Sequence, residues 1–150
     1  MRIVLQRVIS ASVTIDNLIY SSIDNGLLIF LGIEQKDEME DVNWLCHKLI
    51  NLRIFNDNDG IMNVSVKDMK GELLVISQFT LHALTKKGNR PSYKRAAKHE
   101  IAIPLYEAFI YLLKEISGLN VKCGKFAADM KVSLLNDGPV TILMDSKSRE

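Results

Sequence analysis

Cysteine is scarce in this chain, and the long apolar runs that mark membrane proteins are absent. Cys46 and Cys123 are the only cysteines among 150 residues and lack C-x-x-C spacing. They are therefore expected to be reduced, buried thiols, with no disulfide framework. No apolar run approaches the roughly 18 residues of a membrane span, and the N-terminal residues lack the apolar core of a secretory signal. We expect a cytoplasmic protein with no membrane segment.

Familiar catalytic signatures are missing as well. The sequence has no G-x-S-x-G elbow, no glycine-rich phosphate loop and no H-E-x-x-H motif. Its three histidines, His47, His82 and His99, lack the carboxylate spacing of a metal site. We expect structural or surface roles for these histidines, and neither a metal nor a cofactor.

The residues that are present describe an ordinary globular domain. Hydrophobic residues make up 47% of the chain and charged residues 25%, which is the balance of a typical folded protein. A chain of this length can bury about two thirds of its unfolded surface in one core. We expect a single domain over residues 1–145, followed by a frayed tail at residues 146–150.

Hydrophobic periodicity predicts many short strands and two helices. The expected strands span residues 2–9, 11–15, 19–23, 27–33, 52–55, 62–66, 72–81, 121–125, 131–135 and 140–145. One helix is expected to begin near Asp37, whose acidic neighbours suit the positive end of a helix dipole. The other is expected at residues 103–117, with Pro104 in its first turn. Strands in blocks with helices on one side indicate an α+β fold, a layered β/β/α domain with mainly antiparallel strands.

Positive charge is concentrated in one loop of a chain whose formal net charge is only +1. The cationic residues of this basic loop are Lys86, Lys87, Arg90, Lys94, Arg95 and Lys98. A solvated basic surface and a small patch that contacts phosphates are both consistent with this pattern.

Two segments have the composition to present backbone atoms to a ligand. Residues 77–81 follow a strongly apolar run and are polar where the strand leaves the core. Residues 136–141 contain Gly138-Pro139, where glycine lets a partner approach its carbonyl closely and proline fixes φ. A plain strand-to-loop transition and an ordinary hairpin turn are the alternative interpretations.

Four segments occur in the order and spacing of the D-aminoacyl-tRNA deacylases. They are Ser-Gln-Phe-Thr-Leu at residues 77–81, Gly-Asn-Arg-Pro-Ser-Tyr at 88–93, Gly-Lys-Phe-Ala-Ala-Asp-Met at 124–130 and Asn-Asp-Gly-Pro-Val-Thr at 136–141. Segments 6–8, 11–13, 53–55 and 62–63 also look like the N-terminal half of that family. The chain therefore resembles these enzymes, the D-tyrosyl-tRNA(Tyr) deacylase family, over essentially residues 1–145.

The resemblance implies a homodimeric hydrolase. Its substrate would be the ester that joins a D-amino acid, or glycine on a non-cognate tRNA such as tRNA(Ala), to the terminal adenosine of tRNA. Gly138-Pro139 would be the family's Gly-cisPro motif, which enters the partner subunit's site and excludes L-amino acids with its carbonyl oxygens.

The same resemblance assigns the remaining site residues. The floor of the site would be formed by Ser77, Gln78, Phe79 and Thr80, and its lining would include Phe126 and Met130, for which ordinary packing is the alternative. No base lies near Thr80 in the sequence, so the substrate's own ribose 2′-hydroxyl is expected to assist water. By their charge, Lys86, Lys87 and Arg90 are expected to contact acceptor-stem phosphates.

Three other functions are left open by the sequence. The basic loop and the missing triad fit a tRNA-binding module without catalysis. A related editing domain would act on L-amino acids mischarged to tRNA. A general serine or threonine esterase would depend on the hydroxyl of Ser77 or Thr80.

Overall fold

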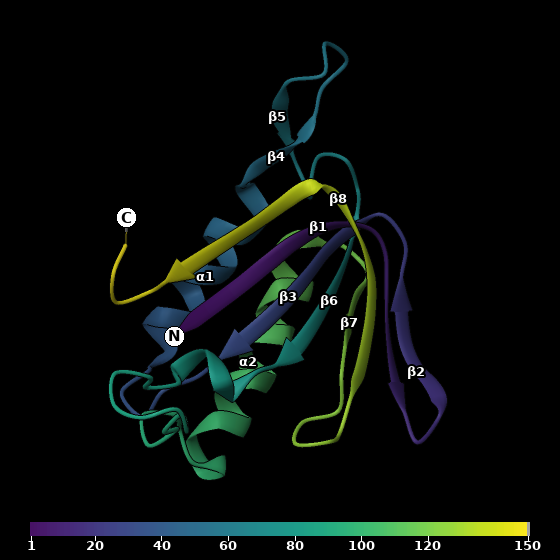
Figure 1. The fold of residues 1–150 in the computed structure, drawn as a ribbon. Helices are drawn as coiled ribbons and strands as arrows, with labels where there is room; N and C mark the ends of the chain where they lie inside the picture. The colour runs from purple at the N-terminus through teal and green to yellow at the C-terminus, as the bar shows by residue number, and fades with distance from the viewer. Residues whose placement is uncertain (150) are drawn as a thin grey trace.

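A six-stranded sheet with two helices on one of its faces forms the body of the molecule (Figure 1). The computed structural model describes residues 1–149. The sheet strands are β1 (Arg2–Ile15), β2 (Leu18–Ile23), β3 (Gly26–Gly32), β6 (Glu72–Ser77), β7 (Val121–Cys123) and β8 (Lys131–Asp145). They run in the order β2-β1-β3-β6-β7, and β8 pairs with β1. The pairs of β1 with β2, β3 and β8 are antiparallel, whereas β3-β6 and β6-β7 are parallel. The predicted α+β class with mainly antiparallel strands and two main helices is confirmed.

The two helices are α1 (Met39–Asn51) and α2 (His99–Ser117). A capping box between Glu38 and Asp41 begins α1, because each side chain accepts a hydrogen bond from the other residue's backbone. Helix α2 begins four residues before the predicted Ile103, so the expectation that Pro104 lies in its first turn was wrong. The first turn forms ahead of the proline, where the Ala102 amide donates to the Lys98 carbonyl at 2.9 Å.

Both faces of the central strands are buried. Leu27, Ile29 and Leu31 of β3 belong to an apolar cluster that includes both helices. Leu28 belongs to a second cluster, which includes Val13 of β1 and residues of β2 and β6. A strand that is buried on both faces has apolar residues at successive positions, and not an alternation of apolar and polar residues. This explains the uninterrupted apolar sequence of β3.

Strand β8 is one strand, although the sequence predicted two with a turn between them. Both of its halves pair with β1, since Asn136 lies opposite Val8 and Thr141 lies opposite Gln6. The four residues 137–140 therefore face a single residue, Arg7. A hairpin would reverse the chain, whereas this bulge leaves β8 running in one direction. Strand β1 is likewise continuous where two strands were predicted.

Strand β6 ends at Ser77, four residues before the predicted end at Leu81. The Gln78 amide still donates to the Leu31 carbonyl at 2.7 Å, and the chain then turns into a short 3-10 helix, η1 (Phe79–His82). The remaining strands, β4 (Arg53–Asn56) and β5 (Met62–Ser65), form a separate hairpin that projects from the body (Figure 1).

The end of the chain packs on its beginning, so residues 146–149 do not have the frayed structure that we expected. The Ser146 hydroxyl is buried and accepts a hydrogen bond from the Met1 amino group at 2.9 Å. Lys147 pairs with Asp41 at 2.8 Å. Residue 150 lies outside the described residues. No helix in the described part of the chain is long and apolar enough to cross a membrane.

Candidate active site

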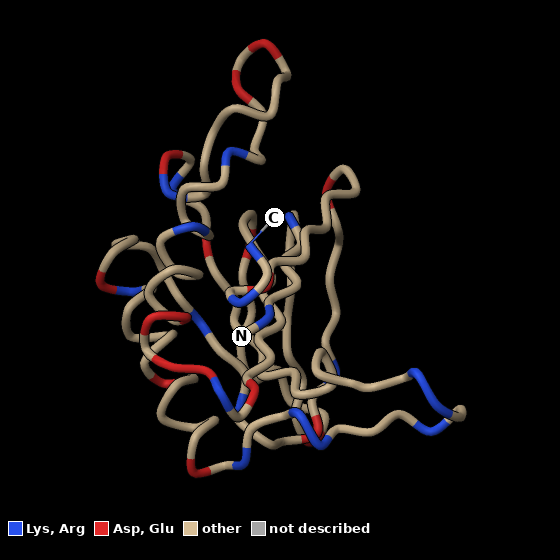
Figure 2. The backbone as a smooth tube through the Cα atoms, turned by 90° about the vertical axis from the view of Figure 1, so that its left-hand side faces the viewer, with Lys and Arg blue, Asp and Glu red and all other residues tan. Residues whose placement is uncertain are grey.

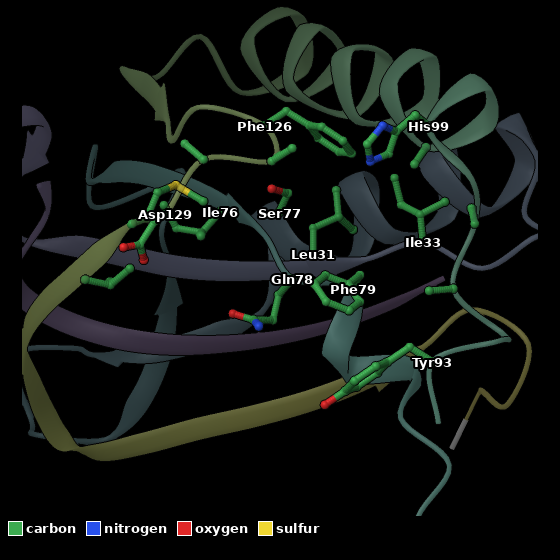
Figure 3. Close-up of a pocket in the computed structure, with 17 residues that line it drawn as sticks. Leu31, Ile33, Ile76, Ser77, Gln78, Phe79, Tyr93, His99, Phe126 and Asp129 are labelled. Carbon is green, nitrogen blue, oxygen red and sulfur yellow. The ribbon is translucent and has the colours of Figure 1, made fainter. Parts of the chain in front are cut away.

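A pocket of about 580 Å³ lies where the ends of β3 and β6 meet the start of α2 and residues 126–130. Because β3 and β6 are parallel, their carboxyl ends lie at the same edge of the sheet. Among the residues that the sequence predicted for the site, this pocket brings together Ser77, Gln78, Phe79, Phe126 and Met130. Figure 3 shows Phe126 on one side of the pocket, Phe79 on the other and Ser77 between them.

The floor of the pocket carries polar groups without charge. The Gln78 side-chain amide donates to the Thr80 hydroxyl oxygen at 2.6 Å. Thr80 lies in η1 and is not among the residues that line the pocket. Within residues 1–149, no histidine or carboxylate forms a hydrogen bond with its hydroxyl. Thr80 therefore lacks the neighbouring base that a threonine nucleophile needs.

One wall of the pocket is aromatic. The ring of His99, from the first turn of α2, contacts Phe126 edge to face, with their centroids 5.7 Å apart. Met130 lies beside Gly124, where an added Cβ would be only 2.5 Å from the Met130 sulfur. Glycine at this position therefore makes room for Met130. No sequence pattern distinguished His99, because an isolated histidine near the start of a helix is usually a surface residue.

Gly138 and Pro139 lie elsewhere, on the bulge of β8, and the peptide bond between them is cis. The side chain of Arg7, on the neighbouring strand β1, is buried and contacts this bulge. Its Nε donates to the Asp137 carbonyl at 3.1 Å and forms an ion pair with the Asp137 carboxylate at 3.0 Å. A second donor of Arg7, Nη1, reaches the Ile54 carbonyl of β4 at 2.6 Å. The guanidinium thus ties the bulge to a neighbouring hairpin.

Only glycine fits at position 138. Its φ of +128° is one that other residues rarely adopt. An added Cβ would lie 2.8 Å from a Val140 methyl and 3.0 Å from a nitrogen of Arg7. The Asn136 side chain closes the bulge by accepting a hydrogen bond from the Val140 amide at 2.9 Å. The backbone of the bulge is therefore fixed from both sides.

A single chain does not bring the bulge and the pocket together. The bulge lies opposite Arg7, whose partner on β3 is Leu27. Ser77 pairs with Leu31, at the opposite end of β3. In Figure 1 the bend of β8 is accordingly at the top of the sheet, whereas β6 points downward to its end.

The basic loop projects from the body of the molecule (Figure 2). Its base is closed by two hydrogen bonds between Leu84 and Ser92, at 2.8 and 3.0 Å. The predicted tRNA-contacting residues Lys86, Lys87 and Arg90 are exposed on it, and they form no ion pair within residues 1–149. They do not line the pocket, but Tyr93, which follows the loop, does.

The last residue of η1, His82, is a buried histidine. Only 1% of His82 is exposed, and neither ring nitrogen has a hydrogen-bond partner within residues 1–149. Burial lowers the pKa of His82 below its ordinary value, and this effect exceeds the opposite effects of a backbone contact at Gly32 and of Glu34. The described residues contain no group of three side chains that could hold a metal ion.

Known proteins resemble this chain over its full length. The profile of the family described as D-Tyr-tRNA(Tyr) deacylase matches residues 4–145. A curated protein from Flavobacterium psychrophilum is 61% identical, and one from Bacteroides fragilis is 60% identical. Both matches cover 100% of each chain, and both relatives are named D-aminoacyl-tRNA deacylase.

Two solved structures are also similar. One, described as c-Myc DNA Unwinding Element Binding Protein, is 39% identical with a TM-score of 0.91, and the match covers 97% of this chain and 98% of that one. The other, described as a probable eukaryotic D-amino acid tRNA deacylase, is 14% identical with a TM-score of 0.80 over 95% and 97% of the two chains. At that identity the second likeness concerns the fold alone.

Proposed function

The chain belongs to the D-Tyr-tRNA(Tyr) deacylase family of ester hydrolases, and we propose that it releases D-amino acids from tRNA in the cytoplasm. The observation that carries this proposal is the pocket, because it unites the floor residues Ser77, Gln78 and Phe79 with Phe126 and Met130 of another motif. These segments are far apart in the sequence. The proposed substrate is the aminoacylated 3′ end of tRNA.

The proposal includes a homodimer of layered β/β/α subunits. Pocket and bulge lie at opposite ends of β3, so Gly138-Pro139 can reach a pocket only in a second copy of the chain. Apolar side chains on β8 support such a contact, since Leu135 is 55% exposed and Leu143 is 66% exposed. Strand β8 is also an edge strand, with backbone groups free on one side.

Rejection of L-amino acids follows from the proposed position of the bulge. A hydrophobic pocket separates substrates by only about 1–3 kcal/mol per methylene, so a side-chain pocket cannot accept many D side chains and still exclude every L side chain. Rigid backbone carbonyls of Gly138 and Pro139 at the α-carbon would exclude one hand by steric clash. Glycine has no side chain to exclude, and glycine on tRNA(Ala) is therefore a second proposed substrate.

The proposed chemistry relies on the substrate and the backbone. Water attacks the ester carbonyl with assistance from the ribose 2′-hydroxyl, because no protein base contacts Thr80. The amides of Phe79 and Thr80 begin η1 and have no acceptor within residues 1–149. Donors of this kind stabilise the oxyanion that forms as the carbonyl is attacked.

The direct test compares hydrolysis of the D and L forms of one aminoacyl-tRNA. Purified protein is expected to release D-Tyr from D-Tyr-tRNA and to spare L-Tyr-tRNA, as measured by release of labelled amino acid. Equal hydrolysis of both would refute the chiral filter and favour an editing domain for L-amino acids. Cleavage of simple esters that disappears in Ser77→Ala would favour a general esterase.

Nucleic-acid binding without turnover is the second candidate. It is favoured by the exposed Lys86, Lys87 and Arg90, and by the 39% identical structure whose description names a DNA element binding protein. Retained binding of D-Tyr-tRNA with no release of amino acid would support this alternative.

A further inference from the structure

Two aromatic side chains lie exposed beside each other at the edge of the pocket. Phe79 is 57% exposed and Tyr93 is 40% exposed. Their ring centroids are 5.1 Å apart, with an interplanar angle of 75°. Figure 3 shows this pair on the side of the pocket opposite Phe126 and His99. The pocket thus has aromatic surfaces at two separate places, and the outer one is accessible.

The backbone holds both rings in place. Phe79 begins η1, two residues after Ser77 ends β6. Tyr93 follows the hydrogen-bonded pair of Leu84 and Ser92, and its carbonyl accepts a hydrogen bond from the Ala96 amide at 3.0 Å. The edge-to-face contact leaves ring surface open to a ligand. Such a pair loses little conformational freedom on binding.

Positive charge is close to Tyr93 in the sequence. Lys94 follows Tyr93 directly, and Arg90 precedes it by three residues. Lys86 and Lys87 belong to the same loop, whose base is closed by Leu84 and Ser92. Figure 2 shows that a loop rich in Lys and Arg projects from the molecule. None of these four cations forms an ion pair within residues 1–149. By contrast, Arg95 is paired with Glu34 at 3.0 Å. Exposed aromatic rings beside unpaired cations are the combination that binds single-stranded nucleic acid, by base stacking and phosphate contact.

We propose that Phe79 and Tyr93 form a stacking platform for the base of the unpaired nucleotide that precedes the terminal adenosine of the substrate. This inference rests on the proposed function, which places the terminal nucleoside in the pocket. Stacking tolerates any base, because every base has a π-face. Tyr93 therefore binds the substrate by contacting a second unpaired nucleotide. It takes no part in the chemistry.

The test uses two minimal substrates, D-tyrosyl-adenosine and the D-tyrosyl ester of cytidylyl-adenosine. One stacked base is worth about 1–3 kcal/mol, so the wild-type KM for the dinucleotide ester is expected to be roughly tenfold lower, with similar kcat. Tyr93→Leu is expected to erase this difference, and Tyr93→Phe to keep it. Tyr111→Leu, at a tyrosine that is 66% exposed on α2, is the matched control and should behave as wild type.

Three results would overturn the platform. Equal KM values for the two substrates in wild type would show that the second base is not bound. If Tyr93→Leu raises the KM values of both esters by the same factor, Tyr93 only lines the pocket that binds the terminal nucleoside. A change in self-association of Tyr93→Leu, measured by sedimentation, would make the pair a protein contact.

Binding measurements separate this inference from the proposed function. The Kd values of uncharged adenosine and cytidylyl-adenosine do not depend on hydrolysis. If wild type hydrolyses neither ester but binds the dinucleotide roughly tenfold more tightly through Tyr93, the platform stands and the proposed activity fails. If both esters are hydrolysed but the two Kd values are equal, the platform fails and the activity stands.

Discussion

The two ends of β3 carry the two halves of the proposed site, and different forces stabilise them. At the pocket floor the Gln78 amide donates to the Thr80 hydroxyl, a neutral contact, and the guanidinium of Arg2 reaches η1 only at the Leu81 carbonyl, at 3.2 Å. At the bulge end a buried guanidinium forms an ion pair with Asp137 and hydrogen bonds to two backbone carbonyls. Hydrogen bonds to charged groups are roughly twice as strong as neutral ones.

This difference matches the two proposed tasks. The ester group that reacts is itself uncharged, so neutral hydrogen-bonding groups are sufficient at the floor beneath it. A barrier that works by steric clash must not move, and the Arg7 contacts keep the Asp137 backbone in place. The floor of the pocket thus makes a neutral contact where the substrate is proposed to bind, and the bulge is held by charged hydrogen bonds.

Removal of Arg7 is expected to have the largest effect on this comparison. Arg7→Ala leaves the Ile54 and Asp137 carbonyls without their donor and is expected to lower the free energy of unfolding by about 2–3 kcal/mol. The midpoint of thermal unfolding should then fall by about 5–10 °C. Selectivity for D-Tyr-tRNA over L-Tyr-tRNA should fall with it, because the bulge is no longer held.

Arg7→Lys is the matched control. It keeps the positive charge but cannot donate in two directions from a planar group, so we expect intermediate stability and reduced selectivity. Unchanged selectivity in a folded Arg7→Ala protein would show that the bulge is rigid without its ion pair.

Acidification below pH 6.5 is expected to destabilise the protein through His82. The lowered pKa of His82 means that the unfolded chain binds a proton below pH 6.5 while the folded chain does not. The contribution of His82 to stability is thus complete above pH 6.5. It is lost as pH falls toward the lowered folded pKa, by at most about 1.4 kcal/mol per pH unit.

Denaturant titrations at pH 7 and pH 5 would measure this loss. His82→Leu should flatten the dependence in that interval, whereas His47→Leu, at an exposed residue of α1, should leave it unchanged. The same slope in wild type and His82→Leu would assign the effect to other groups. The lowered pKa values of Asp41 and Asp145 affect stability only in more acidic solution.

The smallest effect is expected from the hydroxyl of Thr80. Thr80→Val keeps the shape of the side chain and removes the acceptor for Gln78. We expect kcat for D-Tyr-tRNA to fall by less than roughly tenfold, since mispositioned groups change rates far less than a lost nucleophile does. A fall of roughly 10⁴-fold or more in single-turnover assays would instead make Thr80 a nucleophile.

The pocket half of the site could be predicted from the sequence because its signals are local. The apolar run before Ser77 predicts a buried strand, and the polar residues after it mark where that strand leaves the core. The assignment of Phe126 and Met130 to the same pocket came from the resemblance alone. Their meeting with Ser77 depends on the parallel pairs of β6 with β3 and β7, which no local pattern specifies.

The bulge half could not be predicted in full. The local residues at 136–141 predict a turn, whereas the structure has a strand that continues, because both flanks pair with β1. Register of this kind is set by contacts more than a hundred residues apart in sequence. The role of Arg7 was missed for the same reason, since its partners Ile54 and Asp137 lie on two other elements.

The pairing of β8 with β1 on both sides of the bulge also bears on how such a barrier can change through evolution. Four residues, 137–140, stand where a regular ladder would have one, so their length and sequence are not constrained by the ladder itself. The strand pairs on both flanks, Val8 with Asn136 and Gln6 with Thr141, do not depend on what these four residues are. Gly138 does depend on its surroundings, because an added Cβ would meet Val140 and Arg7. The proposed selective element is thus an insertion that the β8 ladder tolerates and that its own contacts to Arg7 and Asn136 hold in shape.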